Sequence, residues 1–252
     1  MVCPESDPRE TGSRYIVSAA LGKSLIRQLD HLCPMARLLT RDFSNHAKST
    51  GLSSTRREGL PLAHEADISL SSSTGAVVVS MAQLQPNSLA GEREAQFRQK
   101  MLTVAAMYDK VIVLISVPKA SWTSDNTRAY TDFVAFAKML DTSVETALVG
   151  HKEECLAKWI IYLMNEYRYE GRKNEHLLVE GEATWEAFFR HGGANVYAAQ
   201  VLSGALSAAY GSQGLARLLA MTPDERITAF GAVIGTRRPL DNLSRWVSKE
   251  RI

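Results

Sequence analysis

The sequence has little of several features that mark particular classes of protein. Its 252 residues contain only three cysteines, which are widely spaced and include no Cys-x-x-Cys pair. This excludes a disulfide scaffold and favours a reducing, intracellular environment. No apolar run approaches the roughly 18–20 residues of a membrane span, and residues 1–13 lack the apolar core of a signal peptide. The net charge is only +2, so any surface that binds nucleic acid must be local.

The first two thirds of the chain alternate between strand-like and helix-like patterns. Short apolar runs predict strands over 15–21, 36–40, 67–70, 76–81, 111–117 and 145–149. Between and after them, apolar residues at helical spacing predict helices over 23–32, 95–108, 132–140 and 152–169. Strands separated by helices indicate an α/β domain whose mainly parallel sheet has flanking helices on both faces.

The composition changes near residue 169, which divides the chain. We expect a disordered lead over 1–13, the α/β domain over 14–168, and a charged linker over 169–182. An all-α domain is expected over 183–252, with helices at 184–190, 196–210, 215–220, 223–234 and 240–249. Both domains have ordinary sizes for independent folding units.

Two short motifs resemble ligand-binding sites, one for a phosphate and one for a metal, but each lacks residues that such a site needs. Gly22, Lys23 and Ser24 stand between a strand and a helix, yet Val17 occupies the position where a phosphate-binding loop needs its first glycine. His151 and Cys155 have the i, i+4 spacing of a metal-binding pair, but a structural zinc needs four ligands. We therefore expect neither a metal nor a cofactor.

Two glycine turns in the helical domain form similar helix–turn–helix hairpins. The first contains Gly192 and Gly193, and the second contains Gly235, Thr236 and the pair of arginines that follows it, Arg237 and Arg238. Glycine allows a phosphate to approach the backbone, and the next helix begins with free N–H groups. The alternative is two plain turns with glycine caps. Two copies, in a segment with eight basic and five acidic residues, favour a tandem helix-hairpin-helix domain that binds DNA.

Two helices carry apolar stripes that are candidates for a protein interface. The first lies within 152–169 and the second ends the chain; core packing is the alternative for both. The predicted partner-binding residues are Trp159, Ile160, Leu163, Met164, Leu240, Leu243 and Trp246.

The order of these parts resembles the XPF family of structure-specific nucleases. The resemblance covers about 14–250 and rests on the strand over 108–115, the linker and the two hairpins. Within the family, the stretches Ala66–Gly75 and Val77–Ser80 resemble the fungal meiotic crossover subunits of the Zip and SHOC kind. The resemblance implies a nuclease-like domain over 14–168 and a heterodimer with an ERCC-like partner chain.

The acidic residues of active family members are largely missing here. Where the family has an aspartate on its first strand, this chain has Val17–Ala20, and Val77–Gln83 stands where Glu-Arg-Lys is expected. Asp67 alone matches, as a remnant of the active site. One carboxylate is a poor site for Mg²⁺, which prefers near-octahedral oxygen ligation.

The resemblance and its missing acids together imply a non-catalytic subunit that binds branched DNA. The setting would be meiotic recombination in the nucleus, with no membrane contact. One alternative is an active endonuclease that recruits other acids, such as Asp42 or Asp125. The other is an interaction scaffold with no DNA role.

Overall fold

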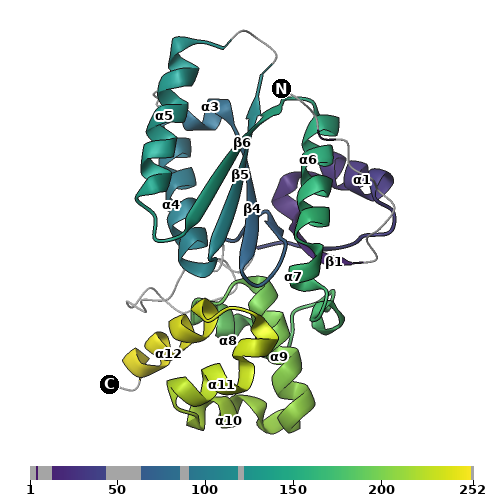
Figure 1. The fold of residues 1–252 in the computed structure, drawn as a ribbon, viewed down its shortest axis with the longest axis vertical. Helices are drawn as coiled ribbons and strands as arrows, with labels where there is room; N and C mark the ends of the chain where they lie inside the picture. Colours follow the sequence, from purple (N-terminus) through teal and green to yellow (C-terminus); the bar gives the residue numbers. More distant parts are fainter. Residues whose placement is uncertain (1–3, 5–12, 44–63, 86–90, 119–121, 251–252) are drawn as a thin grey trace.

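The computed structural model describes residues 4, 13–43, 64–85, 91–118 and 122–250. Apart from residues 4 and 13, the predicted disordered lead over 1–13 lies outside the described residues. The described chain has an α/β part and, below it in Figure 1, a helical part. Among the described helices, none combines the length and the apolar composition needed to cross a membrane.

The α/β part is built on a six-stranded sheet with the order β2-β1-β3-β4-β5-β6. Its strands are β1 (Arg14–Ser18), β2 (Arg37–Arg41), β3 (Ile68–Ser69), β4 (Thr74–Ser80), β5 (Lys110–Val117) and β6 (Ser143–Gly150). The pairs β1–β2, β4–β5 and β5–β6 are parallel, whereas the short β3 runs antiparallel to both of its neighbours. The sheet is therefore mainly parallel, as predicted.

Helices cover both faces of this sheet (Figure 1). One face packs against α1 (Lys23–Leu32) and α6 (Glu153–Glu166), and the other packs against α3 (Met81–Leu84), α4 (Gly91–Met107) and α5 (Ser124–Lys138). A short helix, η2 (Ala19–Leu21), connects β1 to α1. Strand β5, which lies between β4 and β6, is apolar along most of its length because it is buried on both faces.

The helical part contains the two predicted hairpins. Its elements are α8 (Glu186–His191), α9 (Val196–Tyr210), η4 (Gly211–Gln213), α10 (Gly214–Ala220), α11 (Pro223–Ile234) and α12 (Arg238–Glu250). Helices α8 and α9 form the first hairpin, and α11 and α12 form the second. The buried face of α9 is the centre of this core, and α8, α10 and α11 contact it. The expected fold class, an α/β domain followed by an all-α domain, is confirmed.

The predicted linker is folded and packed. It contains α7 (Arg168–Gly171) and η3 (Glu175–Leu177), and the Leu178 side chain is fully buried in the core of the helical part. That same core also takes in Ile16 and Leu39 from the sheet. The two parts therefore share apolar packing.

Buried polar groups add to this contact between the parts. Asn195 caps α9, and its side-chain Nδ2 also donates to the carbonyl oxygens of Ser72 at 2.8 Å and Met107 at 3.1 Å. The Glu65 carboxylate accepts hydrogen bonds from the Tyr108 hydroxyl at 2.9 Å and the Val196 N–H at 2.9 Å. Because unsatisfied buried polar groups are costly, these contacts fix how the two parts meet.

Candidate functional site

The first glycine turn is buried against α12. A Cβ on Gly192 would lie 2.6 Å from Leu243 Cδ1, and Gly193, at φ +88°, is against Asn242. The N–H groups of both glycines already donate to carbonyl oxygens of α8. In this structure these glycines allow α12 to pack closely on the turn, and the expectation that Gly192 and Gly193 hold a DNA phosphate stays a prediction.

The second glycine turn lies at the surface and is partly used by the chain itself. Gly235 is exposed, with φ +82° and open space around its Cα, but its N–H donates to the Gly231 carbonyl oxygen at 2.8 Å as a helix cap. The Thr236 hydroxyl donates to the Asp109 carboxylate, and Arg238 Nε donates to the other oxygen of that carboxylate at 2.8 Å. Thr236 and Arg238 thus attach α12 to the α/β part, and their role as phosphate ligands stays a prediction.

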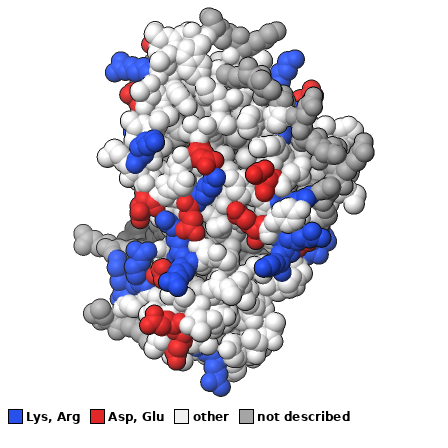
Figure 2. Space-filling model, in the orientation of Figure 1, with Lys and Arg blue, Asp and Glu red and all other residues white. Residues whose placement is uncertain are grey.

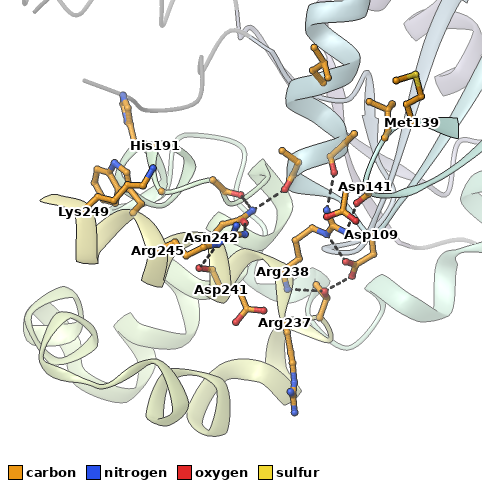
Figure 3. A pocket seen from close by; sticks show the side chains of 18 residues that line it. Asp109, Met139, Asp141, His191, Arg237, Arg238, Asp241, Asn242, Arg245 and Lys249 are labelled. Atoms are coloured by element: carbon orange, nitrogen blue, oxygen red, sulfur yellow. Dashed lines mark hydrogen bonds and ion pairs between the residues drawn. The ribbon is translucent and has the colours of Figure 1, made fainter. Parts of the chain in front are cut away.

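Arg237 is the predicted DNA-binding side chain that remains exposed. In Figure 3 its side chain points away from Asp109 and from the neighbouring Arg238. Two further exposed basic residues, Arg172 and Lys173, lie in the segment after α7. The next residue, Asn174, donates through its side chain to the Val233 carbonyl oxygen, which brings this segment to the same end of α11 as the second turn.

The exposed basic residues of this region follow the boundary between the two parts. Figure 2 shows Lys and Arg side chains gathered at that level, over α12 on one side and near α7 on the other. Sequence reasoning missed Arg172 and Lys173 because they lie outside the hairpins. The two adjacent basic residues were visible in the sequence. A basic pair of this kind is also typical of an ordinary linker, so the sequence alone did not single it out.

The remnant acid Asp67 is buried and has both carboxylate oxygens occupied. Lys100 Nζ of α4 donates to Oδ1 at 2.6 Å, and the Val78 N–H donates to Oδ2 at 2.8 Å. The Asp67 side chain is only 6% exposed, whereas that of Lys100 is 24% exposed. The ammonium group therefore supplies the positive charge that this buried carboxylate requires.

No other acids join Asp67 to make a metal centre within the described ranges. Across those residues, no three His, Cys, Asp or Glu side chains lie close enough to share an ion. Asp42 follows β2, and Asp125 is exposed in the first turn of α5, so neither makes such a group with Asp67. His151 is exposed and Cys155 is half-buried.

Comparisons with known proteins place the chain in a family. The family model described as "Domain of unknown function (DUF7102)" matches residues 5–176. The chain belongs to the DUF7102 family. A second model, described as a SAM-like domain, matches residues 179–247, which corresponds to the helical part.

The other two comparisons concern curated proteins and solved structures. No curated protein matches the chain. Among solved structures, XPF from Aeropyrum pernix is similar at 11% identity and a TM-score of 0.42, over 93% of this chain and 97% of that one. XPF from Aeropyrum pernix in complex with DNA is similar at 13% identity and a TM-score of 0.40, over 93% and 98% of the two chains.

Most of the predicted partner-binding residues are buried in this DUF7102 chain itself. Ile160, Leu163 and Met164 pack between α6 and the sheet, while Leu240 and Leu243 lie in the helical core. In this conformation these five side chains pack within the chain, and their role in binding a partner stays a prediction. Their apolar stripe is explained by the packing of α6 on the sheet and of α12 on the helical core.

Two predicted interface aromatics lie nearer the surface. Trp159 is half-buried and makes an edge-to-face contact with Tyr162, which is 39% exposed. Trp246 is half-buried against Phe188, with ring centroids 5.0 Å apart. The outer face of α6 is therefore the part of the predicted interface that stays accessible.

Proposed function

We propose that the chain is a non-catalytic subunit that binds branched DNA through exposed basic side chains and works with a second protein chain. The non-catalytic part of this proposal rests on the ion pair between Lys100 and Asp67. A hard divalent cation needs several oxygen ligands. Asp67 brings one carboxylate, and a lysine ammonium already lies against it.

Support for DNA binding comes from the basic residues along the boundary between the two parts. Arg237, Arg172 and Lys173 are exposed and lie around one end of α11. Charges of this kind contact phosphates, which positions a protein on DNA without reading its sequence. Binding should therefore depend strongly on salt and weakly on base sequence.

The partner and the biological setting rest on different support. The exposed aromatic edge of Tyr162 beside Trp159 suits a subunit interface. The likeness of Ala66–Gly75 and Val77–Ser80 to fungal meiotic subunits favours an ERCC-like partner, a role in crossover formation and a nuclear location. Co-expression with an ERCC-like chain should give a complex that Tyr162→Glu weakens, while the equally exposed Tyr210→Glu serves as the matched control.

A cleavage assay tests the non-catalytic part of the proposal. The chain, with and without its partner, is incubated with flap, bubble and four-way junction DNA in Mg²⁺ or Mn²⁺. The expected result is intact DNA in every case. Cleavage that is lost on Asp67→Ala would overturn this part and favour the endonuclease alternative.

Salt-dependent binding tests the DNA part. The triple variant Arg172→Glu, Lys173→Glu, Arg237→Glu should bind branched DNA of every sequence more weakly. Its log–log salt slope should fall by about one unit for each phosphate that the variant no longer binds. Arg217→Glu, an exposed charge reversal on α10, is the matched control and should bind normally. Unchanged affinity of the triple variant would favour the scaffold alternative.

A further inference from the structure

A groove runs between α12 and the adjoining end of the α/β part. Its volume is about 940 Å³, near the upper end of the range for small-ligand pockets. Helix α12 forms one wall with Asp241, Arg245 and Lys249. Leu102 of α4 and Met139, just after α5, also line the groove, and Figure 3 shows Met139 on its α/β side.

The α/β side of the groove is an exposed apolar lip. The Met139 residue is 85% exposed and the Leu102 residue is 48% exposed, although both are large hydrophobic residues. Isolated exposed apolar residues are normal, but here two of them line the same groove. Methionine is also flexible and polarizable, and is common at surfaces that adapt to a binding partner.

The charge of the groove changes sign along α12. At its inner end, Asp109 is paired with Arg238, Asp141 and Asp241 add two exposed carboxylates, and Arg237 adds one exposed guanidinium, so this end keeps a net negative charge. Toward the end of the helix, Arg245 and Lys249 make the wall basic. In Figure 3 these two basic residues lie near His191, on the side of the groove away from Asp141.

We propose that this groove binds a short amphipathic peptide segment of a partner protein. The segment would place aliphatic side chains on Leu102 and Met139, and carboxylates against Arg245 and Lys249. Its other end would carry basic residues that face Asp141. Arg172 and Lys173, two of the three residues proposed to bind DNA, do not line this groove, whereas Arg237 lies at its inner end.

Charge complementarity favours a peptide over a nucleic acid strand. A nucleic acid strand carries a negative charge at every phosphate, so it cannot match a wall that is acidic at one end and basic at the other. A peptide can carry opposite charges at its two ends. Its aliphatic side chains also remove the apolar lip from water, which favours binding.

The test selects short random peptides from a displayed library on the immobilised full-length chain. The expected peptides combine aliphatic residues with carboxylates at one end and basic residues at the other. Their affinity should fall roughly tenfold or more on Met139→Glu or on Leu102→Glu, since each puts a charge where an apolar contact forms. Met35→Glu is the matched control, because Met35 is 61% exposed elsewhere on the chain, and it should leave binding unchanged.

Two outcomes would overturn the proposal. In the first, the selected peptides bind the Met139→Glu and Leu102→Glu chains as tightly as the original, or no peptide is recovered. In the second, a labelled oligothymidine loses its affinity on these same two changes, which would assign the groove to nucleic acid. The Arg172→Glu, Lys173→Glu double variant, whose changes lie outside the groove lining, should weaken DNA binding and keep peptide binding, so failure of the DNA proposal is distinguished from failure of this one.

Discussion

The pairing of Lys100 with Asp67 predicts an asymmetry between two conservative changes. Lys100→Met keeps the length of the side chain but removes the cation from the Asp67 carboxylate, which is 6% exposed, while the Val78 N–H still donates to it. Asp67→Asn keeps an oxygen that can accept from Val78. It leaves a lysine that is already 24% exposed and can turn toward water. We therefore expect the lysine change to destabilise the protein more.

The magnitudes follow from the burial of the two partners. Removing one partner of a fully buried pair costs about 3–5 kcal/mol. Since Lys100 is partly exposed, the expected cost of Lys100→Met is lower, about 2–3 kcal/mol. Asp67→Asn should cost about 1 kcal/mol, as for the loss of an ordinary hydrogen bond. The double variant should cost less than the sum, because the carboxylate that needed a cation is gone.

Urea unfolding at neutral pH measures these differences through the transition midpoints. Lys158→Met is the matched control, because Lys158 pairs with Glu154 on the exposed face of α6. That pair should contribute less than about 1 kcal/mol. The reasoning is refuted if Lys100→Met costs no more than Lys158→Met, or if the effects of the Lys100 and Asp67 changes simply add.

Three further changes test other parts of the structure. Gly192→Ala should cost about 1–3 kcal/mol in urea unfolding, because its Cβ would lie 2.6 Å from Leu243 Cδ1; weaker DNA binding by the folded variant would contradict this packing role. Arg238→Ala should cost about 1–3 kcal/mol in the same assay, because it breaks the ion pair with Asp109 and leaves two carbonyl oxygens without this donor. Burial raises the pKa of Glu65 above 4.5, so the folded state binds its proton more readily and stability falls as pH rises from 4.5 through the folded pKa. Glu65→Gln should remove that part of the pH dependence, and an unchanged slope would count against it.

Local sequence signals predicted the bounds of two helices of the helical part, whereas the helix expected over 132–140 spans Ser124–Lys138. The helices expected over 196–210 and 223–234 have those bounds in the structure. Asn195 caps the first of them, and the second starts with a capping box at Thr222 followed by Pro223. Such signals act within one turn of a helix, so they can be recognised without knowing the tertiary neighbours.

Predictions were weaker where tertiary contact decides the outcome. The first strand was expected to reach residue 21, but it ends at Ser18, whose side chain accepts from the Ala20 N–H and starts η2. The charged segment over 169–182 was expected to be a linker, yet Leu178 is buried in the helical core. The prediction used the average composition of each segment. One capping side chain or one buried leucine hardly changes that average, so neither outcome could be predicted from it.

The two glycine turns show that the roles of functional residues also depend on tertiary contacts. Both have the pattern of apolar helix, glycine and apolar helix, so the sequence assigned both the same role. In the folded chain, a Cβ on Gly192 would meet Leu243 and Trp246, while Gly235 has open space around it. The difference comes from the neighbours of each turn, which the local pattern does not contain.

At the second turn, the adjacent residues Arg237 and Arg238 also have different roles. Arg238 is the first residue of α12 and reaches the α/β part at Asp109, whereas Arg237 stands just before the helix and points to solvent. Once Arg238 is engaged, it orients α12, and this orientation keeps Arg237 outside the contact between the parts. One arginine thus stabilises the arrangement that exposes the other, so a charge reversal of both at once would mix a loss of stability with weaker phosphate binding. Arg237 is therefore changed without Arg238 in the DNA-binding test.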